Sequence, residues 1–144
     1  MRSLYYYVSA LVIATFLVVS CKTQNAQKAT TDITGKTWKL TELNGKPIEL
    51  KNPKNNPYFK LEMDGMRYQG HAGCNGLGGT FEIKPEIMRI KFNQGMSTMM
   101  ACEDLDIENQ FTKAILAADN YSVNGNTLTL NKARMAPLAK FVLQ

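Results

Sequence analysis

The sequence predicts a mainly β fold, an antiparallel sheet that curls into a barrel or half-barrel of about eight strands with one α-helix over about 104–118. Several short segments alternate apolar and polar residues, as half-buried strands do. Tight-turn dipeptides separate neighbouring segments, at Asn44–Gly45, Asp64–Gly65 and Asn124–Gly125. The apolar spacing changes to three and four residues only once, after Cys102, and this change indicates the single helix.

The expected strands follow one another with short connections. In chain order they span 36–44, 58–63, 66–73, 79–84, 87–92, the two arms of a hairpin within 120–131, and 137–143. Since side chains alternate across a strand, one set of residues in each segment should face the core. For the clearest segments these are Trp38, Leu40, Leu43, Phe59, Leu61, Met63, Met88, Ile90 and Phe92.

The helix is expected between the fifth and sixth strands, where it would cover an opening or a face of the sheet. Glu103 or Asp104 would satisfy its first amides and favour the positive end of the helix dipole. Its mostly apolar stripe is expected to consist of Leu105, Glu108, Phe111, Ala114, Ile115 and Ala118.

Residues 1–21 are expected to be a lipoprotein signal peptide. Arg2 gives a short positive region, and the apolar run that follows is too short for a comfortable membrane span. The run ends in "LVVSC", which resembles the lipobox of bacterial lipoproteins, so Cys21 is the expected lipidation site. The alternative is an ordinary signal peptide with an incidental cysteine.

Residues 22–34 are polar and are expected to form a flexible tether, because they offer little apolar surface to bury. Residues 35–144 then form one small domain. Lipid on Cys21 would place this domain in the bacterial cell envelope, with a membrane as its first partner. Lys22 after the cysteine is compatible with an outer-membrane lipoprotein that faces the periplasm or the surface.

The charge pattern gives no indication of nucleic-acid binding. The chain has 17 Lys and Arg and 12 Asp and Glu, a net charge of +5, which falls by one when Arg2 is removed. The basic residues are scattered and interleaved with apolar ones, and no basic run occurs. The remaining expected partner is an unknown envelope protein or a small ligand.

The stretch "GHAGCNGLGG" (70–79) has four possible interpretations. A phosphate loop is disfavoured, because no Gly-Lys-Ser/Thr and no helix follow it. A zinc site would have His71, Cys74 and Cys102 as ligands, without a second ligand pair to support them. A nucleophilic Cys74 would need His71 as its base. We therefore expect no metal, no cofactor and no catalytic residue.

The fourth interpretation is a scaffold corner with a Cys74–Cys102 disulfide. Once Cys21 is acylated, two cysteines remain in an exported domain, and they most simply pair. The bridge would close a loop of about 29 residues and contribute ~3–4 kcal/mol. The glycines would then permit positive backbone φ angles and close contact between backbone segments, and Asn75 would tolerate a left-handed turn.

The motifs "GHAGCNGLGGTFEI" and "MSTMMACED…ENQF" resemble those of the META domain, or HslJ-like, lipoprotein family. The chain differs at Met99, where relatives often carry a basic residue. The resemblance implies a lipocalin-like curved sheet with a helix, an envelope location, a link to stress or drug tolerance, and no established catalysis. The matching residues are Trp38, Leu40, Gly73, Cys74, Asn75, Gly79, Phe81, Thr98, Met100, Ala101, Cys102, Glu108 and Phe111.

Three functions remain open from the sequence. The first is a non-enzymatic binding or stability module whose possible contact residues are His71, Asn75, Leu77 and the "MSTMM" segment from Met96 through Met99 to Met100. The simpler expectation for these methionines is that they fill the core. The second is a tethered inhibitor of an exported lysozyme or protease, which would present the 93–100 loop. The third, an enzyme, lacks a defensible set of catalytic residues.

Overall fold

The computed structural model describes residues 32–134 and 137–144. The expected signal peptide (1–21), with Cys21, and residues 22–31 of the expected tether lie outside the described residues. The described chain forms nine strands, one α-helix and three single-turn 3-10 helices, η1 (Pro53–Asn55), η2 (Asp64–Met66) and η3 (Pro85–Ile87). The strands and α-helix are β1 (Thr37–Leu43), β2 (Lys46–Pro47), β3 (Tyr58–Glu62), β4 (Arg67–His71), β5 (Gly76–Lys84), β6 (Arg89–Asn93), α2 (Leu105–Ala117), β7 (Asn120–Asn124), β8 (Thr127–Asn131) and β9 (Pro137–Leu143).

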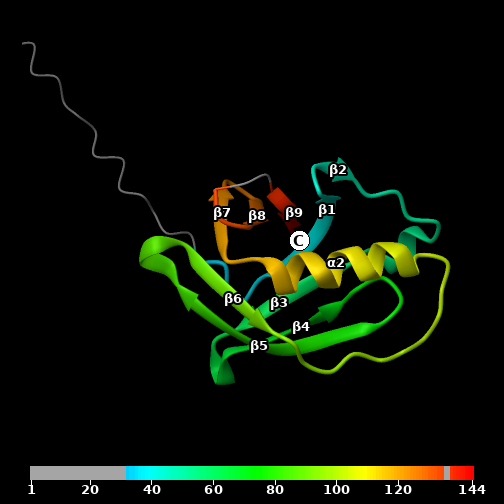
Figure 1. Ribbon diagram of the computed structural model, residues 1–144, viewed down its shortest axis with the longest axis horizontal. Coiled ribbons are helices and arrows are strands. Elements are labelled where there is room, and N and C mark those ends of the chain that lie inside the picture. The colour runs from blue at the N-terminus through cyan, green and yellow to red at the C-terminus, as the bar shows by residue number, and fades with distance from the viewer. Residues whose placement is uncertain (1–31, 135–136) are drawn as a thin grey trace, which may run out of the picture.

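Eight antiparallel strands close into a barrel, in the order β1-β3-β4-β5-β6-β7-β8-β9, and β9 returns to pair with β1 (Figure 1). The short β2 pairs only with the end of β1. Helix α2 lies between β6 and β7 in the chain and packs on β6, β9 and β1. The expected mainly β class, the eight principal strands and the place of the helix are thus confirmed.

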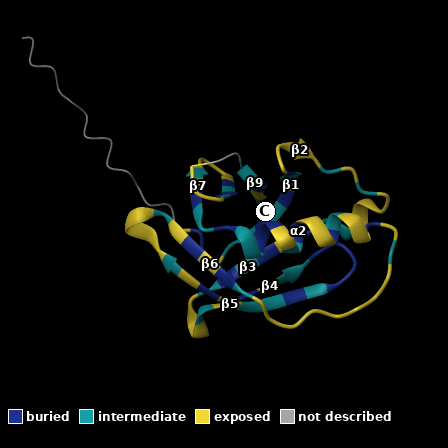
Figure 2. Cartoon of the chain, viewed as in Figure 1, coloured by how far each residue is buried: buried dark blue, intermediate teal, exposed yellow. Residues whose placement is uncertain are grey.

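Apolar side chains fill the barrel. Phe59 is 0% exposed and makes edge-to-face contacts with Phe141, at a ring-centroid distance of 4.9 Å, and with Phe92, at 5.9 Å. Buried residues lie on the inward faces of the strands and on one side of α2, as Figure 2 shows. Because side chains occupy the interior, a binding site in this domain must lie on its outside.

A β-bulge in β1 explains why Trp38, Leu40 and Leu43 are all buried despite their uneven spacing. The pairing with β9 shifts between Leu40 and Glu42, so Thr41 is an extra residue in the ladder. Because of this extra residue, the side chains after it change faces of the strand, so Leu43 points into the barrel as Leu40 does. The Thr41 hydroxyl donates to the carbonyl of Lys140 at 3.1 Å.

Several expected positions differ in the structure. Met63 is 56% exposed and Leu105 is 37% exposed, because each lies at the end of an element where the chain leaves the core. Strand β5 begins at Gly76 rather than at residue 79, since cross-strand pairing with β4 reaches back to that glycine. Ile33 is 1% exposed, so the folded domain includes the last residues of the expected tether.

The barrel is least tightly closed between β6 and β7. The two strands share one pair of facing residues, Arg89 and Asn120, whereas β7 and β8 share five pairs. Helix α2 packs against β6, on one side of this seam, and against β9 and β1, with Phe111, Ala114 and Ile115 buried against the barrel. The chain between β6 and the helix therefore runs along the outside of the barrel.

Within the described ranges, no helix combines the length and the apolar character that a membrane span requires.

Candidate functional site

Residues 94–101, which we call the methionine segment, continue from the end of β6 along the edge of β5. Ser97 forms an isolated bridge with Leu77, and the amide of Gly78 donates to the Met96 carbonyl at 3.1 Å. The Ser97 hydroxyl donates to the carbonyl of Gly76 at 3.0 Å. These contacts fix the first half of the methionine segment on the glycine-rich start of β5.

The side chain of Asn75 fixes the second half. Its Oδ1 accepts from the Thr98 hydroxyl at 2.8 Å and from the Met100 amide at 2.7 Å. Its Nδ2 donates to the Met100 carbonyl at 2.9 Å and to Glu108 Oε1 at 2.7 Å. Asn75 is 2% exposed, so all four hydrogen bonds of its side-chain amide are shielded from water.

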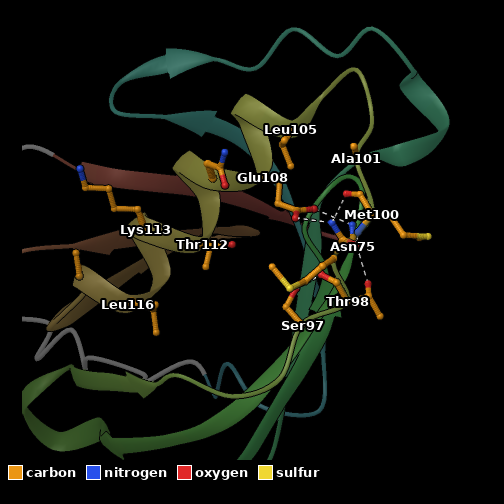
Figure 3. Close-up of a pocket in the computed structure, with 13 residues that line it drawn as sticks. Asn75, Ser97, Thr98, Met100, Ala101, Leu105, Glu108, Thr112, Lys113 and Leu116 are labelled. Atoms are coloured by element: carbon orange, nitrogen blue, oxygen red, sulfur yellow. Dashed lines mark hydrogen bonds between the residues drawn. The ribbon is translucent and has the colours of Figure 1, made fainter.

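Glu108 of α2 orients Asn75. Its Oε2 accepts from the amides of Cys74, at 3.0 Å, and Asn75, at 2.7 Å. Its Oε1 accepts from the Asn75 side chain at 2.7 Å (Figure 3). The carboxylate is 8% exposed and lies on the barrel side of the helix. Three N–H donors compensate for its burial, as a buried charge requires. We call Asn75 and Glu108 with these bonds the Asn75–Glu108 clasp.

A disulfide joins Cys74 to Cys102 beside the clasp, with Cα atoms 5.7 Å apart, and so confirms the predicted pairing. Asp104 follows the bridge and is 3% exposed. The sequence suggested that the Asp104 side chain would cap the helix, but it makes no capping hydrogen bond. Instead it accepts from the amides of Lys51, at 2.8 Å, and Asn52, at 3.1 Å. The loop before β3 is thereby tied to the start of α2.

The glycines of this region mainly allow neighbouring backbone segments to lie close together. Of those in the 70–79 stretch, only Gly73 has a positive φ, at 125°. A Cβ on Gly79 would lie 2.5 Å from the Asn93 carbonyl, and one on Gly95 would lie 1.9 Å from the Gly78 carbonyl. Tyr68 packs beside Gly79 and donates to Asn93 at 3.2 Å, and burial raises the pKa of its hydroxyl.

The methionines do not fill the core, contrary to the simpler expectation. Met96 is 88% exposed, Met99 98% and Met100 62%. The backbone of the methionine segment is bonded on its inner side to β5 and Asn75, so these side chains are left on the outer side. Leu77, proposed as a contact residue, is instead 8% exposed and belongs to the core.

A surface groove of about 830 Å³ runs between the methionine segment and α2 (Figure 3). One wall carries Met99, Met100 and Ala101, and the other is the outer face of the helix. The clasp lies at its floor. The helix wall consists of Leu105, Asn109, Thr112, Lys113, Leu116 and Ala117. The sequence shows the three- and four-residue spacing of these helix residues. No local sequence pattern indicates that the methionine segment lies opposite them.

The residues weighed for catalysis or metal binding are not assembled into a reactive site. The sulfurs of Cys74 and Cys102 are bonded to each other. His71 Nδ1 accepts the amide of Gly73 at 3.2 Å, and its ring stacks on Tyr58. Among the described residues, no three His, Cys, Asp or Glu side chains lie close enough to hold a metal ion.

The motif residues carry out two structural tasks. Trp38, Leu40 and Phe81 are each 1% exposed in the core, and the Trp38 indole donates to the Ile33 carbonyl at 2.8 Å. Most of the others build the clasp, the disulfide and the methionine segment that crosses it. Sequence position alone could not show this division, because Asn75 and Glu108 are 33 residues apart.

Comparison with known proteins shows the family of the chain and solved structures with a similar fold. The META domain family matches residues 31–144, and the chain belongs to this family. A crystal structure of a DUF4847 family protein from Bacteroides vulgatus aligns with a TM-score of 0.58 at 17% identity, covering 76% of this chain and 93% of that one. An NMR structure of a protein from Burkholderia xenovorans gives 0.62 at 20% identity, covering 81% and 86%. These likenesses show the fold. Comparison with curated proteins gave no match.

Proposed function

We propose that this META domain protein is a non-enzymatic module of the bacterial cell envelope that binds an apolar segment of another envelope protein. In this proposal lipid on Cys21 holds it on a membrane, most simply the outer membrane, and the binding site is the groove between the methionine segment and α2. The link to envelope stress or drug tolerance that the family resemblance implies is part of the same proposal.

The observation that carries the proposal is the exposure of apolar side chains on a fixed backbone. Met99 and Met100 are exposed on a segment that the clasp holds at the amide and carbonyl groups of Met100. Methionine suits a contact surface because its unbranched thioether adapts to irregular partners. A fixed backbone also lowers the entropy lost on binding.

The form of the groove favours a protein partner over a small ligand. Small-molecule pockets bury most of the ligand surface. Here the walls are themselves exposed, with Met99 98% and Leu105 37% accessible. Such an open surface accommodates side chains from another protein, which brings its own apolar area to cover the methionines.

The state of the ionisable groups supports a non-enzymatic role. Glu108 and Asp104 use their oxygens for backbone amides of the chain itself, and the two cysteines are paired. General acid–base catalysis needs a group free to exchange a proton with substrate. These groups instead support the loops around the groove.

Intact mass of the membrane-extracted protein, alkylated without reductant, tests the envelope part of the proposal. The expected mass carries acyl chains on Cys21 and no alkyl group, since Cys74 and Cys102 are bridged. An unacylated Cys21, or a chain that retains residues 1–20, would contradict the tethered module.

Site-specific photo-crosslinking in the full-length protein tests the groove. A photoreactive residue at Asn109, in the helix wall, should form a defined adduct in the intact envelope, whereas one at the adjacent Gln110 should not. Met99→Asp should abolish the adduct, because a charge would enter the apolar contact, and Met63→Asp should preserve it. Equal adducts at Asn109 and Gln110 would refute a specific groove.

A second candidate is a tethered inhibitor of an exported lysozyme or protease. The fixed, exposed methionine segment is the observation that favours it, since such inhibitors present a rigid loop to an active-site cleft. The purified full-length protein should then inhibit at least one enzyme of a panel of lysozymes and envelope proteases, and Met99→Asp should relieve the inhibition. Unchanged activity of every enzyme would exclude this candidate for that panel.

A further inference from the structure

We propose that Met99 and Met100 form an oxidation site, at which a peroxide or hypohalous acid converts the apolar wall of the groove into a polar one. The effect on binding rests on the proposed function, whereas the chemistry rests on exposure alone. Met99 is 98% exposed and Met100 62%, and both line the groove. The proposal assigns to sulfur a task that a leucine at either position could not perform.

The chemical step is a two-electron transfer to a single oxygen atom. The thioether sulfur attacks one peroxide oxygen, the O–O bond breaks, an S–O bond forms, and the other oxygen leaves as water after taking up the proton. With a hypohalous acid, the net reaction forms the same S–O bond, and a halide ion and a proton are released to water. Thiol-dependent sulfoxide reductases reverse the step by returning two electrons from a pair of thiols, with the oxygen leaving as water.

The structure separates this reaction from the stability of the fold. Met100 is held through its backbone, whose N–H and C=O both bond to Asn75, and the thioether takes no part. A sulfoxide on an exposed side chain therefore remains hydrated and breaks no core contact. Oxidation of a buried methionine has the opposite effect, because it places a polar group among apolar ones.

The same chemistry would change what the groove can bind. An apolar partner that covers Met99 and Met100 removes both side chains from water. If they carry sulfoxide oxygens, those strong acceptors lose their water without gaining a donor, which is unfavourable. The groove would thus bind its partner in the reduced state and release it in the oxidised state.

The chain supplies its own comparison residues. Met96 is 88% exposed on the same segment, but it lies outside the groove. Met63 is 56% exposed in a separate part of the molecule, after β3. Met66 and Met88 are partly buried against the core. The effect of a methionine's exposure can therefore be separated from the effect of its place in the groove within one protein.

The test begins with graded peroxide treatment of the purified full-length protein, free of its partner, followed by peptide mass mapping. Sulfoxide should form at Met99 and Met100 before it forms at Met66 and Met88, with no change in the thermal midpoint. Slower oxidation at Met99 and Met100 than at the partly buried pair would overturn the proposal, as would unfolding on oxidation of these two residues.

The second measurement repeats the Asn109 photo-crosslinking after oxidation. In the unaltered protein the adduct should fall roughly tenfold, because a polar oxygen is buried unpaired. The Met99→Leu/Met100→Leu variant keeps an apolar wall that cannot be oxidised, so its adduct should persist. The Met96→Leu/Met63→Leu variant removes exposed sulfur elsewhere and should lose the adduct like the unaltered protein.

The outcomes separate the two proposals. An adduct that survives complete oxidation of Met99 and Met100 overturns the oxidation site and leaves the groove as a binding surface. An adduct that falls equally in the double-leucine variant also overturns it, since the oxidant then acts elsewhere. Absence of an Asn109 adduct before oxidation refutes the proposed function itself, and the binding effect fails with it.

Discussion

Glu108 joins two parts of the chain that the sequence separates widely. Its carboxylate replaces the water that the amides of Cys74 and Asn75 would otherwise bind, and it directs the Asn75 side chain toward Met100. A charged acceptor with three donors forms stronger hydrogen bonds than a neutral one. The position of the groove wall therefore depends on one side chain of the helix.

Glu108→Gln should destabilise the domain by about 3 kcal/mol, although the side chain keeps its size. Glutamine offers one acceptor oxygen, and its NH₂ group would face either backbone amides or the Asn75 Nδ2, all of which are donors. Urea unfolding at neutral pH measures the change. Glu103→Gln, at an exposed neighbouring position, should shift the free energy of unfolding by less than about 0.5 kcal/mol.

Asp119 is expected to make a small contribution to stability that depends on pH. Its carboxylate accepts the amide of Ala133 and the side chain of Asn120, each at 2.7 Å, and these bonds, with Arg89 nearby, lower its pKa. A lowered folded-state pKa gives stability that is present above the unfolded value, about 3.9, and is lost as pH falls through the folded value.

Asp119→Ala should therefore cost stability at pH 7, within about 1 kcal/mol because the carboxylate is exposed, and the difference should vanish in strong acid. Urea unfolding at both pH values measures it. Asp64→Ala is the control, since the Asp64 side chain makes no hydrogen bond among the described residues. A difference that is equal at both pH values would contradict the assigned role of the charge.

At the scale of elements, the junction between β6 and the methionine segment depends on close backbone contact. Gly95→Ala should destabilise the domain by about 3 kcal/mol, because its Cβ would meet the Gly78 carbonyl at 1.9 Å and backbone must shift. Gly76→Ala is the matched control, since its Cβ would lie 3.9 Å from the Gly70 carbonyl, an ordinary contact. Equal unfolding free energies for the two variants would contradict the steric argument.

The disulfide and the clasp fix the same segment independently. Replacement of Cys74 and Cys102 by alanine should lower the free energy of unfolding by ~3 kcal/mol, since the unfolded chain gains freedom. The Met100 amide should nevertheless remain protected from hydrogen exchange, because Asn75 Oδ1 still accepts it. Loss of that protection in the folded variant would show that the disulfide alone holds the methionine segment.

Local patterns predict the elements of this fold better than their ends. Alternation in 87–92 correctly places Ile90 and Phe92 inside, because β6 pairs along its length with β5, the strand directly before it in the chain. The bulge at Thr41 and the early start of β5 depend on partner strands, so no local pattern reveals them. The exposure of the methionines follows from contacts with Asn75, a distant residue whose partners sequence spacing cannot show.

For the whole molecule, closure of the barrel links its two ends. Strand β1 pairs with both β3 and β9, so the first and last strands of the described chain are neighbours. Between β6 and β7 the ladder is short, and α2 packs across the barrel against β6, β9 and β1. A helix in this position belongs to the barrel core rather than to a separate layer.

Phe111→Ala should consequently destabilise the entire barrel by about 3–5 kcal/mol, and not the helix alone. The ring is 0% exposed and packs 5.9 Å from that of Phe141 in β9, so its loss leaves a cavity between the helix and the barrel. Urea transitions followed by circular dichroism at helical wavelengths and by fluorescence of Trp38 in β1 should move together. Lys113→Ala, on the exposed side of the helix, should shift neither. Two separated transitions in Phe111→Ala would instead show that the barrel stays closed without the helix.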